Sequence, residues 1–233
     1  MNIYVGGCIA YETTRKLYEE HKAELEARFP AFFLREFENL TEGAPSAADF
    51  LGNLCIEKNT QKNYSNGKYY FDGEIYVREI RDGGLFGALW AACEDLVAQH
   101  EALKNADDAF LTEGDFSKIL QSSAIGCEIY LDRIPLDQHV VEVLEYRKES
   151  PYEVPSAGSY LVVCEEQRVP RGKNGGARSG DEIGHSPLLT KIGEITSARD
   201  RVILYGDSRR FLTPPSRQKK DIADRRGHED GAK

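Results

Sequence analysis

Residues 79–90 read Glu-Ile-Arg-Asp-Gly-Gly-Leu-Phe-Gly-Ala-Leu-Trp, and this stretch decides how the surrounding chain folds. Before it, Ile75 and Val77 alternate with polar residues, which predicts a strand over 74–80. After it, the sequence predicts the strongest helix of the chain, from residue 85 to about 100. One apolar stripe of this helix holds Leu85, Leu89, Cys93 and Leu96. The glycine pair therefore marks a tight turn from a strand into a long helix.

Such a turn aims several backbone N–H groups and the positive end of a helix dipole at one point, which favours anions. Arg81, Gly83 and Gly84 are therefore candidate ligands for a nucleotide or phosphate. Glu79 and Asp82 are candidate magnesium ligands, because carboxylates can hold Mg²⁺ between the protein and phosphate oxygens. The alternative is a plain helix start, with Asp82 as the cap and the glycines allowing close packing. No pattern in the sequence identifies a catalytic residue.

The remaining elements alternate irregularly, which favours an α+β sheet covered by helices over a parallel array. Strands are expected within 3–10, 127–131, 159–164, 192–196, 202–205 and 210–212. Helices are expected from a Thr13-Thr14 cap to Phe29, over 31–39, 46–56 and 115–120, and after a cap at Asp137. Ser65-Asn66-Gly67 predicts a hairpin turn. Trp90 is expected to be buried on the long helix beside Phe86 and Val97.

The organisation predicted is one domain over residues 1–213. It carries a polar insertion at 57–73 and a glycine-rich loop at 168–186. The charged segment 214–233 is nearly devoid of large apolar side chains, so we expect it to be a disordered tail.

Composition narrows the possible partners. The net charge of −9 argues against nucleic acid, which requires a basic face. No segment approaches the roughly 20 apolar residues of a membrane span, and the first residues do not resemble a signal peptide. The 5 cysteines are odd in number and far apart, which indicates reduced, mostly buried thiols. We therefore expect a cytoplasmic protein that binds neither nucleic acid nor membrane.

Several segments, in order along the chain, resemble the C-terminal domain of the aminoimidazole ribonucleotide (AIR) synthase-related superfamily. Residues 79–90 resemble its D-x-T/S-E/D-G-G-x-x-G-A-L-W segment, and residues 126–136 resemble G-x-E-I-D-L-D-x-I-P-L. Similar matches are 7–10 with G-T-x-I-L-A, 28–30 with R-F-P, 151–159 with P-Y-E-L-x-S-S-G-S, and 192–196 with I-G-x-I-T. The superfamily includes AIR synthase, formylglycinamide ribonucleotide synthase, selenide water dikinase, thiamine monophosphate kinase and the hydrogenase maturation factor HypE.

The resemblance implies a three-layer α/β/α domain, partly ferredoxin-like, and is closest to the HypE-like branch of hydrogenase maturation. In family members a preceding domain carries most of the Mg-ATP site, whereas the pattern here begins almost at Met1. Within the motif, Glu79 replaces an Asp, and Arg81 replaces a Thr or Ser that contacts the nucleotide. These departures lead us to expect that the chain is not active alone.

Two hypotheses follow from the resemblance and its departures. In the first, the chain is a stand-alone C-terminal domain of an ATP-dependent enzyme. A separate N-terminal-domain subunit, or self-association, would complete the site for Mg-ATP and a small-molecule substrate. In the second, the chain is a non-catalytic binding or regulatory module that kept the fold and lost the chemistry.

Overall fold

The computed structural model describes residues 1–7, 9–29, 69–71, 75–104, 124–165 and 189–215. Several predictions lie outside these residues: the helices at 31–39, 46–56 and 115–120, the turn at 65–67, the loop at 168–186 and the tail beyond 215. Cys8 and Cys55 also lie outside them. In the part of the chain that the structure describes, no helix is long and apolar enough to cross a membrane.

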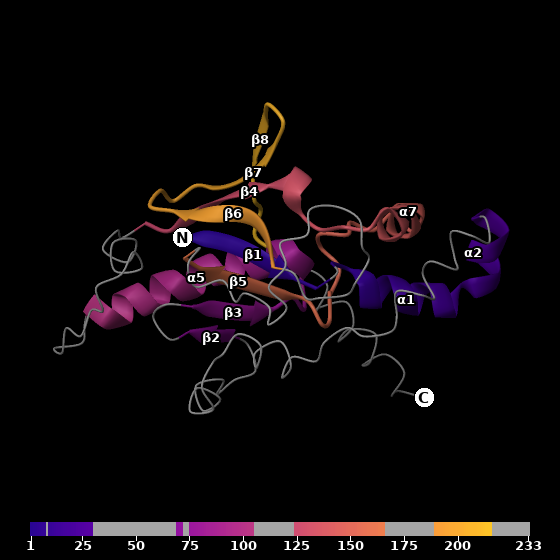
Figure 1. The fold of residues 1–233 in the computed structure, drawn as a ribbon, viewed down its shortest axis with the longest axis horizontal. Coiled ribbons are helices and arrows are strands. Elements are labelled where there is room, and N and C mark those ends of the chain that lie inside the picture. The colour runs from indigo at the N-terminus through magenta and orange to yellow at the C-terminus, as the bar shows by residue number, and fades with distance from the viewer. Residues whose placement is uncertain (8, 30–68, 72–74, 105–123, 166–188, 216–233) are drawn as a thin grey trace, which may run out of the picture.

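Within the described residues, eight strands form one sheet in the order β2-β3-β5-β1-β6-β4-β7-β8 (Figure 1). Their bounds are β1 Asn2–Gly6, β2 Tyr69–Phe71, β3 Tyr76–Glu79, β4 Gly126–Tyr130, β5 Tyr160–Cys164, β6 Thr190–Thr196, β7 Arg201–Tyr205 and β8 Ser208–Phe211. Only β4 and β7 pair in parallel, and the other described neighbours are antiparallel. Each predicted strand within the described residues is present, with shifted ends, and β2 adds part of the predicted insertion to the sheet.

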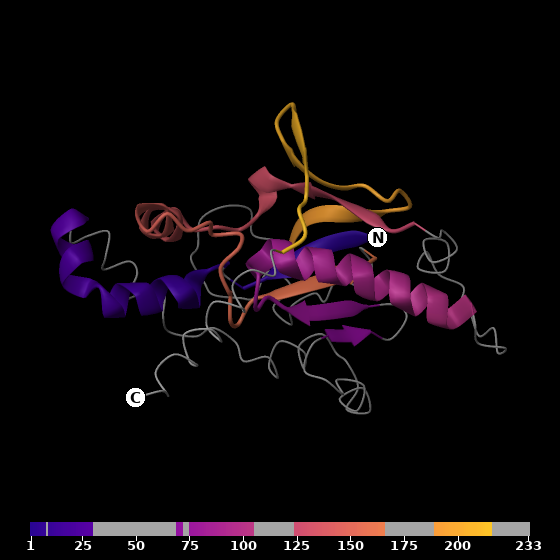
Figure 2. The same ribbon diagram turned by 180° about the vertical axis from the view of Figure 1, so that it is seen from behind.

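The long helix α5, Gly84–Lys104, lies across one face of the sheet (Figures 1 and 2). Three shorter helices lie beyond one end of the strands: α1 Tyr11–Glu20, α2 Lys22–Arg28 and α7 Gln138–Tyr146. A short 3₁₀ turn, η2 at Leu131–Arg133, follows β4. The sheet and α5 therefore form the body of the domain, and α1, α2 and α7 extend from it.

Both faces of the sheet are buried. On the α5 face, Ile3, Val163 and Tyr76 lie in register on neighbouring strands and are fully buried in one apolar cluster with the helix. On the opposite face, the register partners Tyr4, Val162 and Val77 are at most 5% exposed. The predicted α+β class is confirmed, and burial of both faces is what a three-layer arrangement requires.

The start of α1 differs from the prediction. Thr13 and Thr14 do not cap the helix, which begins at Tyr11 after Ala10 in a left-handed conformation with φ 61°. Thr13 lies inside the first turn of the helix, and its hydroxyl instead donates to the carbonyl of Pro155 at 2.6 Å. The predicted single helix to Phe29 is also broken into α1 and α2 at His21. By contrast, the predicted Asp137 cap is confirmed, since its carboxylate accepts from the N–H of His139 at 2.8 Å.

Trp90 packs against the core with Phe86 and Val97 as expected, but its burial is only partial. The fully buried stripe of α5 consists of Leu85, Leu89, Cys93 and Leu96. Phe86, Trp90 and Val97 lie one position further round the helix, where they pack against the edge of the core. The Arg201 guanidinium covers the indole ring, with its Cζ 4.1 Å from the ring centroid.

Three described cysteines are free and buried, as the sequence predicts: Cys93, Cys127 and Cys164. The thiols of Cys93 on α5 and Cys127 on β4 share a hydrogen bond. This bond and burial both raise the pKa of Cys127. The same hydrogen bond lowers the pKa of Cys93. The pair joins the helix to the sheet through two buried thiols.

A polar cluster holds α5 to β3 on the other side of the helix. The buried Tyr76 hydroxyl donates to an Asp95 oxygen at 2.6 Å, and Arg78 donates to the same oxygen at 2.5 Å. Burial is the main cause that raises the pKa of Tyr76 above its usual range. The Asp95 carboxylate thus satisfies two strand side chains at once.

We expect Asp95→Ala to lower the free energy of unfolding by about 2 kcal/mol, because it leaves the buried Tyr76 hydroxyl and the Arg78 charge without their shared acceptor. Glu19→Ala is the matched control, since Glu19 is 61% exposed and its ion pair with Arg15 is 3.9 Å long. That change should cost less than about 0.5 kcal/mol. Urea denaturation of both variants measures the difference. Equal losses would contradict a structural role for the cluster.

Candidate functional site

Three segments far apart in sequence meet at one end of the sheet, and we call this place the three-segment junction. It consists of Gly6, Gly7, Ile9 and Ala10 after β1, residues 79–84 after β3, and residues 151–159 before β5. The register brings them together, because Gly6 and Glu79 both pair with Tyr160. In Figure 1 the junction lies at the end of the strands that faces α1.

Hydrogen bonds tie the three segments to one another. Ile80 donates its N–H to the carbonyl of Ser159 and accepts from the N–H of Ser156, both at 2.9 Å. The Ser156 side chain, fully buried, accepts from the N–H of Ala10 at 2.7 Å. Segment 151–159 is therefore held between the other two.

Gly84 has no room for a side chain. A Cβ at this position would lie 2.5 Å from the carbonyl oxygen of Tyr152 and 2.7 Å from that of Val154. Gly84 has φ 61° and Gly83 has φ 79°, a left-handed conformation that favours glycine. Around Gly83 the nearest atom would be Cα of Gly87 at 3.3 Å, so this position is less crowded. The predicted two-glycine turn is present, and the close approach at Gly84 explains the second glycine.

Two N–H groups at the start of α5 already have acceptors within the chain. Gly84 donates to the carbonyl of Arg81 at 2.9 Å, and Phe86 donates to the carbonyl of Tyr152 at 3.1 Å. The rings of Phe86 and Tyr152 also stack, with centroids 5.1 Å apart. The turn therefore offers an anion fewer N–H donors than the sequence predicts, although the helix dipole still points to it.

The charged candidates lie beside this turn and are partly paired. Arg81 binds one oxygen of Glu79 through two nitrogens, Nη2 at 2.5 Å and Nε at 2.6 Å. The Glu79 side chain is 12% exposed and that of Arg81 is 66% exposed, so the carboxylate is largely covered while the guanidinium faces outward. Asp82 is exposed. Among the described residues no three Asp, Glu, His or Cys side chains gather as a metal site.

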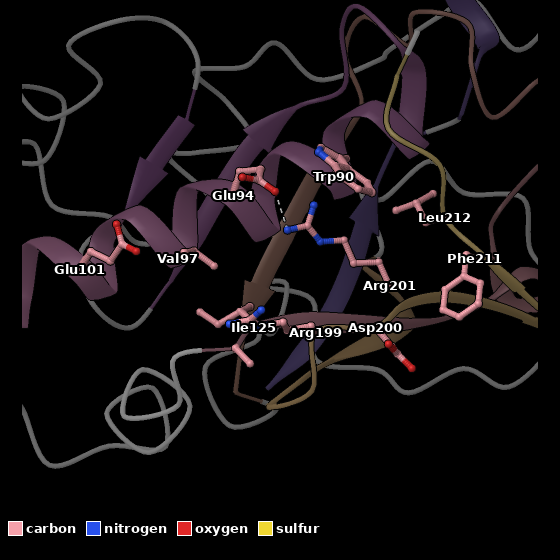
Figure 3. Close-up of a pocket in the computed structure, with 11 residues that line it drawn as sticks. Trp90, Glu94, Val97, Glu101, Ile125, Arg199, Asp200, Arg201, Phe211 and Leu212 are labelled. Carbon is pink, nitrogen blue, oxygen red and sulfur yellow. Dashed lines mark hydrogen bonds and ion pairs between the residues drawn. The ribbon is translucent and has the colours of Figure 1, made fainter.

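A second feature, which the sequence reasoning missed, is a cavity of about 490 Å³ beside α5 (Figure 3). Its helix wall carries Trp90, Glu94, Val97 and Glu101, and residues of the opposite wall include Ile125, Arg199, Arg201 and Leu212. The signal for the helix wall was in the sequence, since intervals of four, three and four residues place these side chains on one helical face. The opposite wall comes from distant segments and gives no local signal.

Comparison with known proteins gives structural matches only. No protein-family model and no curated protein matches the chain. Among solved structures, HypE in complex with ATP matches with a TM-score of 0.45 and 12% identity, over 94% of this chain and 52% of that one. Thiamine monophosphate kinase from Aquifex aeolicus matches with a TM-score of 0.40 and 12% identity, over 90% and 51%. The HypE–HypF complex matches with a TM-score of 0.36 and 17% identity, over 60% and 36%.

The chain spans about half the length of the HypE and kinase chains that it matches.

We expect Gly84→Ala to cost about 3 kcal/mol or more, because backbone strain adds to a collision with segment 152–154. Gly83→Ala should cost about 1–2 kcal/mol, since the left-handed conformation is the main penalty there. The control is Gly206→Ala, where φ is 54° and no atom lies within 4 Å of the added Cβ. Chemical denaturation of the three variants separates strain from collision. Similar losses at Gly84 and Gly206 would show that the close approach does not constrain the fold.

Proposed function

We propose that this chain is the C-terminal domain of an AIR synthase- or HypE-like ATP-dependent enzyme, cytoplasmic, and that a separate N-terminal-domain subunit or a second copy completes its nucleotide and substrate site. The observation that carries this proposal is the three-segment junction. Residues 7–10, 79–84 and 151–159 each resemble the superfamily, and the contacts of the described residues among them surround one helix start. A chance resemblance of separate segments gives no reason for them to meet.

Within this proposal, Arg81 is the phosphate-binding side chain and Glu79 its internal competitor. An ion pair holds Nε and Nη2 of the guanidinium on one carboxylate oxygen, so Glu79 competes with an anion for Arg81. Glu79 and Asp82 are oxygen donors of the kind that suit Mg²⁺, which would neutralise charge between the carboxylates and phosphate oxygens. Engagement of Glu79 by the metal would leave Arg81 and the Gly83–Gly84 turn for the phosphate.

The chain alone supplies only part of such a site. Glu79 and Asp82 are two carboxylates, whereas Mg²⁺ prefers six oxygen ligands. Further ligands would come from the phosphates and the partner subunit. The chain would thus contribute positioning and charge, and the partner would contribute most of the contacts that phosphoryl transfer needs.

A second candidate function is the non-catalytic binding or regulatory module. The observation in its favour is the state of the turn, where Glu79 neutralises Arg81 and two N–H groups donate inside the chain. A turn whose charged and N–H groups are already paired inside the chain serves mainly to pack the start of the helix. The two proposals differ in whether Mg²⁺ and a nucleotide bind there.

We expect the purified chain to show no ATP hydrolysis above background, because it holds too few ligands for Mg-ATP and its phosphates. Release of inorganic phosphate from Mg-ATP is the measurement, with Asp82→Asn as the control. Turnover by the wild type that disappears in Asp82→Asn would contradict the need for a partner.

We also expect pyrophosphate to bind weakly, and more tightly with Mg²⁺ than without it. In Glu79→Gln the binding should lose its dependence on Mg²⁺, because the charge of Glu79 no longer competes for Arg81 and one metal ligand is gone. Arg81→Ala should weaken binding about tenfold or more, as expected for the loss of a charged hydrogen bond. Arg28→Ala on α2 is the matched control.

Isothermal titration calorimetry with and without Mg²⁺ distinguishes these cases. Binding unchanged in both Glu79→Gln and Arg81→Ala would place the ligand elsewhere. Absence of binding under all conditions would favour the non-catalytic module.

A further inference from the structure

The cavity beside α5 has walls of opposite charge (Figure 3). Glu94 and Glu101 come from the helix, and Arg199 and Arg201 come from the segment that enters β7. Asp200 also lines the cavity, but its carboxylate pairs with Arg209 at 3.1 Å. Acidic groups on one wall therefore face basic groups on the other.

One pair of opposite charges closes across the cavity. Arg201 Nη2 lies 2.6 Å from Glu94 Oε1, and the Arg201 side chain is only 12% exposed. The guanidinium is also held over the Trp90 ring. This pair is fixed and already neutral, so it forms a wall of the cavity and is not its ligand-binding charge.

The second pair of opposite charges in the cavity, Glu101 and Arg199, does not form an ion pair. Glu101 and Arg199 line the same cavity and are exposed. Neither takes part in an ion pair with another described residue. One wall thus presents a carboxylate and the other a guanidinium, without contact between them.

Apolar side chains also line the cavity. Trp90 and Val97 come from α5, and Ile125 and Leu212 come from the sheet side. Ile125 and Leu212 are at most 4% exposed and belong to the core cluster. The cavity volume of about 490 Å³ is in the range of small-molecule sites.

We propose that this cavity binds a zwitterion of the amino-acid type, a free amino acid or a dipeptide with an apolar side chain. Its carboxylate binds Arg199, its ammonium binds Glu101, and its side chain lies on the apolar surface. A zwitterion is the class of ligand whose two charges complement both Arg199 and Glu101. A phosphate dianion would be repelled by Glu101, and a neutral apolar ligand would leave both open charges unused. The site is separate from the three-segment junction and does not depend on its function.

The probes are L-phenylalanine and the dipeptide L-leucyl-L-phenylalanine, titrated into the whole chain by isothermal titration calorimetry. Trp90 is the chain's single tryptophan, so its fluorescence reports binding at this cavity. We expect saturable binding of at least one probe with a change in Trp90 emission. N-acetyl-L-phenylalanine lacks the ammonium and L-phenylalaninamide lacks the carboxylate, so each should bind about tenfold more weakly than the parent amino acid where that binds.

Arg199→Gln and Glu101→Gln should each weaken binding about tenfold, whereas Arg28→Gln and Glu26→Gln on α2 should not. The double variant Arg199→Glu/Glu101→Arg exchanges the two charges and should retain binding in the reversed orientation. Both open positions are exposed, so these variants should fold. Failure of both probes to bind saturably would overturn the proposal. Binding of the amide or the N-acetyl form as tight as that of the parent amino acid, or binding unchanged in both single variants, would also overturn it.

Discussion

The missing side chain of Gly84 allows the backbone of residues 152–154 to lie against the start of α5, and the other contacts of the junction depend on this approach. With segment 151–159 in this place, Ser156 reaches both Ile80 and Ala10. The contact with Ile80 fixes the end of β3, and the contact with Ala10 fixes the start of α1. Even the left-handed Ala10 fits this account, because its N–H is directed to the Ser156 oxygen instead of a local cap.

Helix α5 connects the two candidate sites. Its first residue belongs to the junction, and a face further along it forms one wall of the cavity. Two residues on different sides of α5 hold it to the sheet: Asp95 binds β3 and Cys93 binds β4. A helix fixed in this way is a rigid element, so any displacement of its start is transmitted along its length.

The helices and strands that depend on neighbouring residues in the sequence were predicted correctly. Alternating residues around Val77, the stripe of Leu85 and Leu89, and the Asp137 cap each depend on near neighbours, and the structure agrees with them. The errors arise where distant contacts decide. Thr13 bonds to Pro155 instead of capping α1, and Trp90 faces an arginine more than 100 residues away. The motifs placed the junction correctly as a two-glycine turn, but not the Glu79–Arg81 pair or the acceptors of the first N–H groups. The cavity could not be predicted because its walls meet only in the folded chain.

The hydrogen-bonded thiols of Cys93 and Cys127 have a consequence for measuring how the domain opens. Both sulfurs are at most 1% exposed, and they lie between α5 and the sheet. An alkylating reagent therefore reaches them only during the moments when the helix separates from the strands. When the helix recloses faster than the reagent reacts, the rate at which the two thiols are modified equals the opening population multiplied by the rate for a free thiol. Thiol modification of the native protein therefore measures how often α5 separates from the sheet.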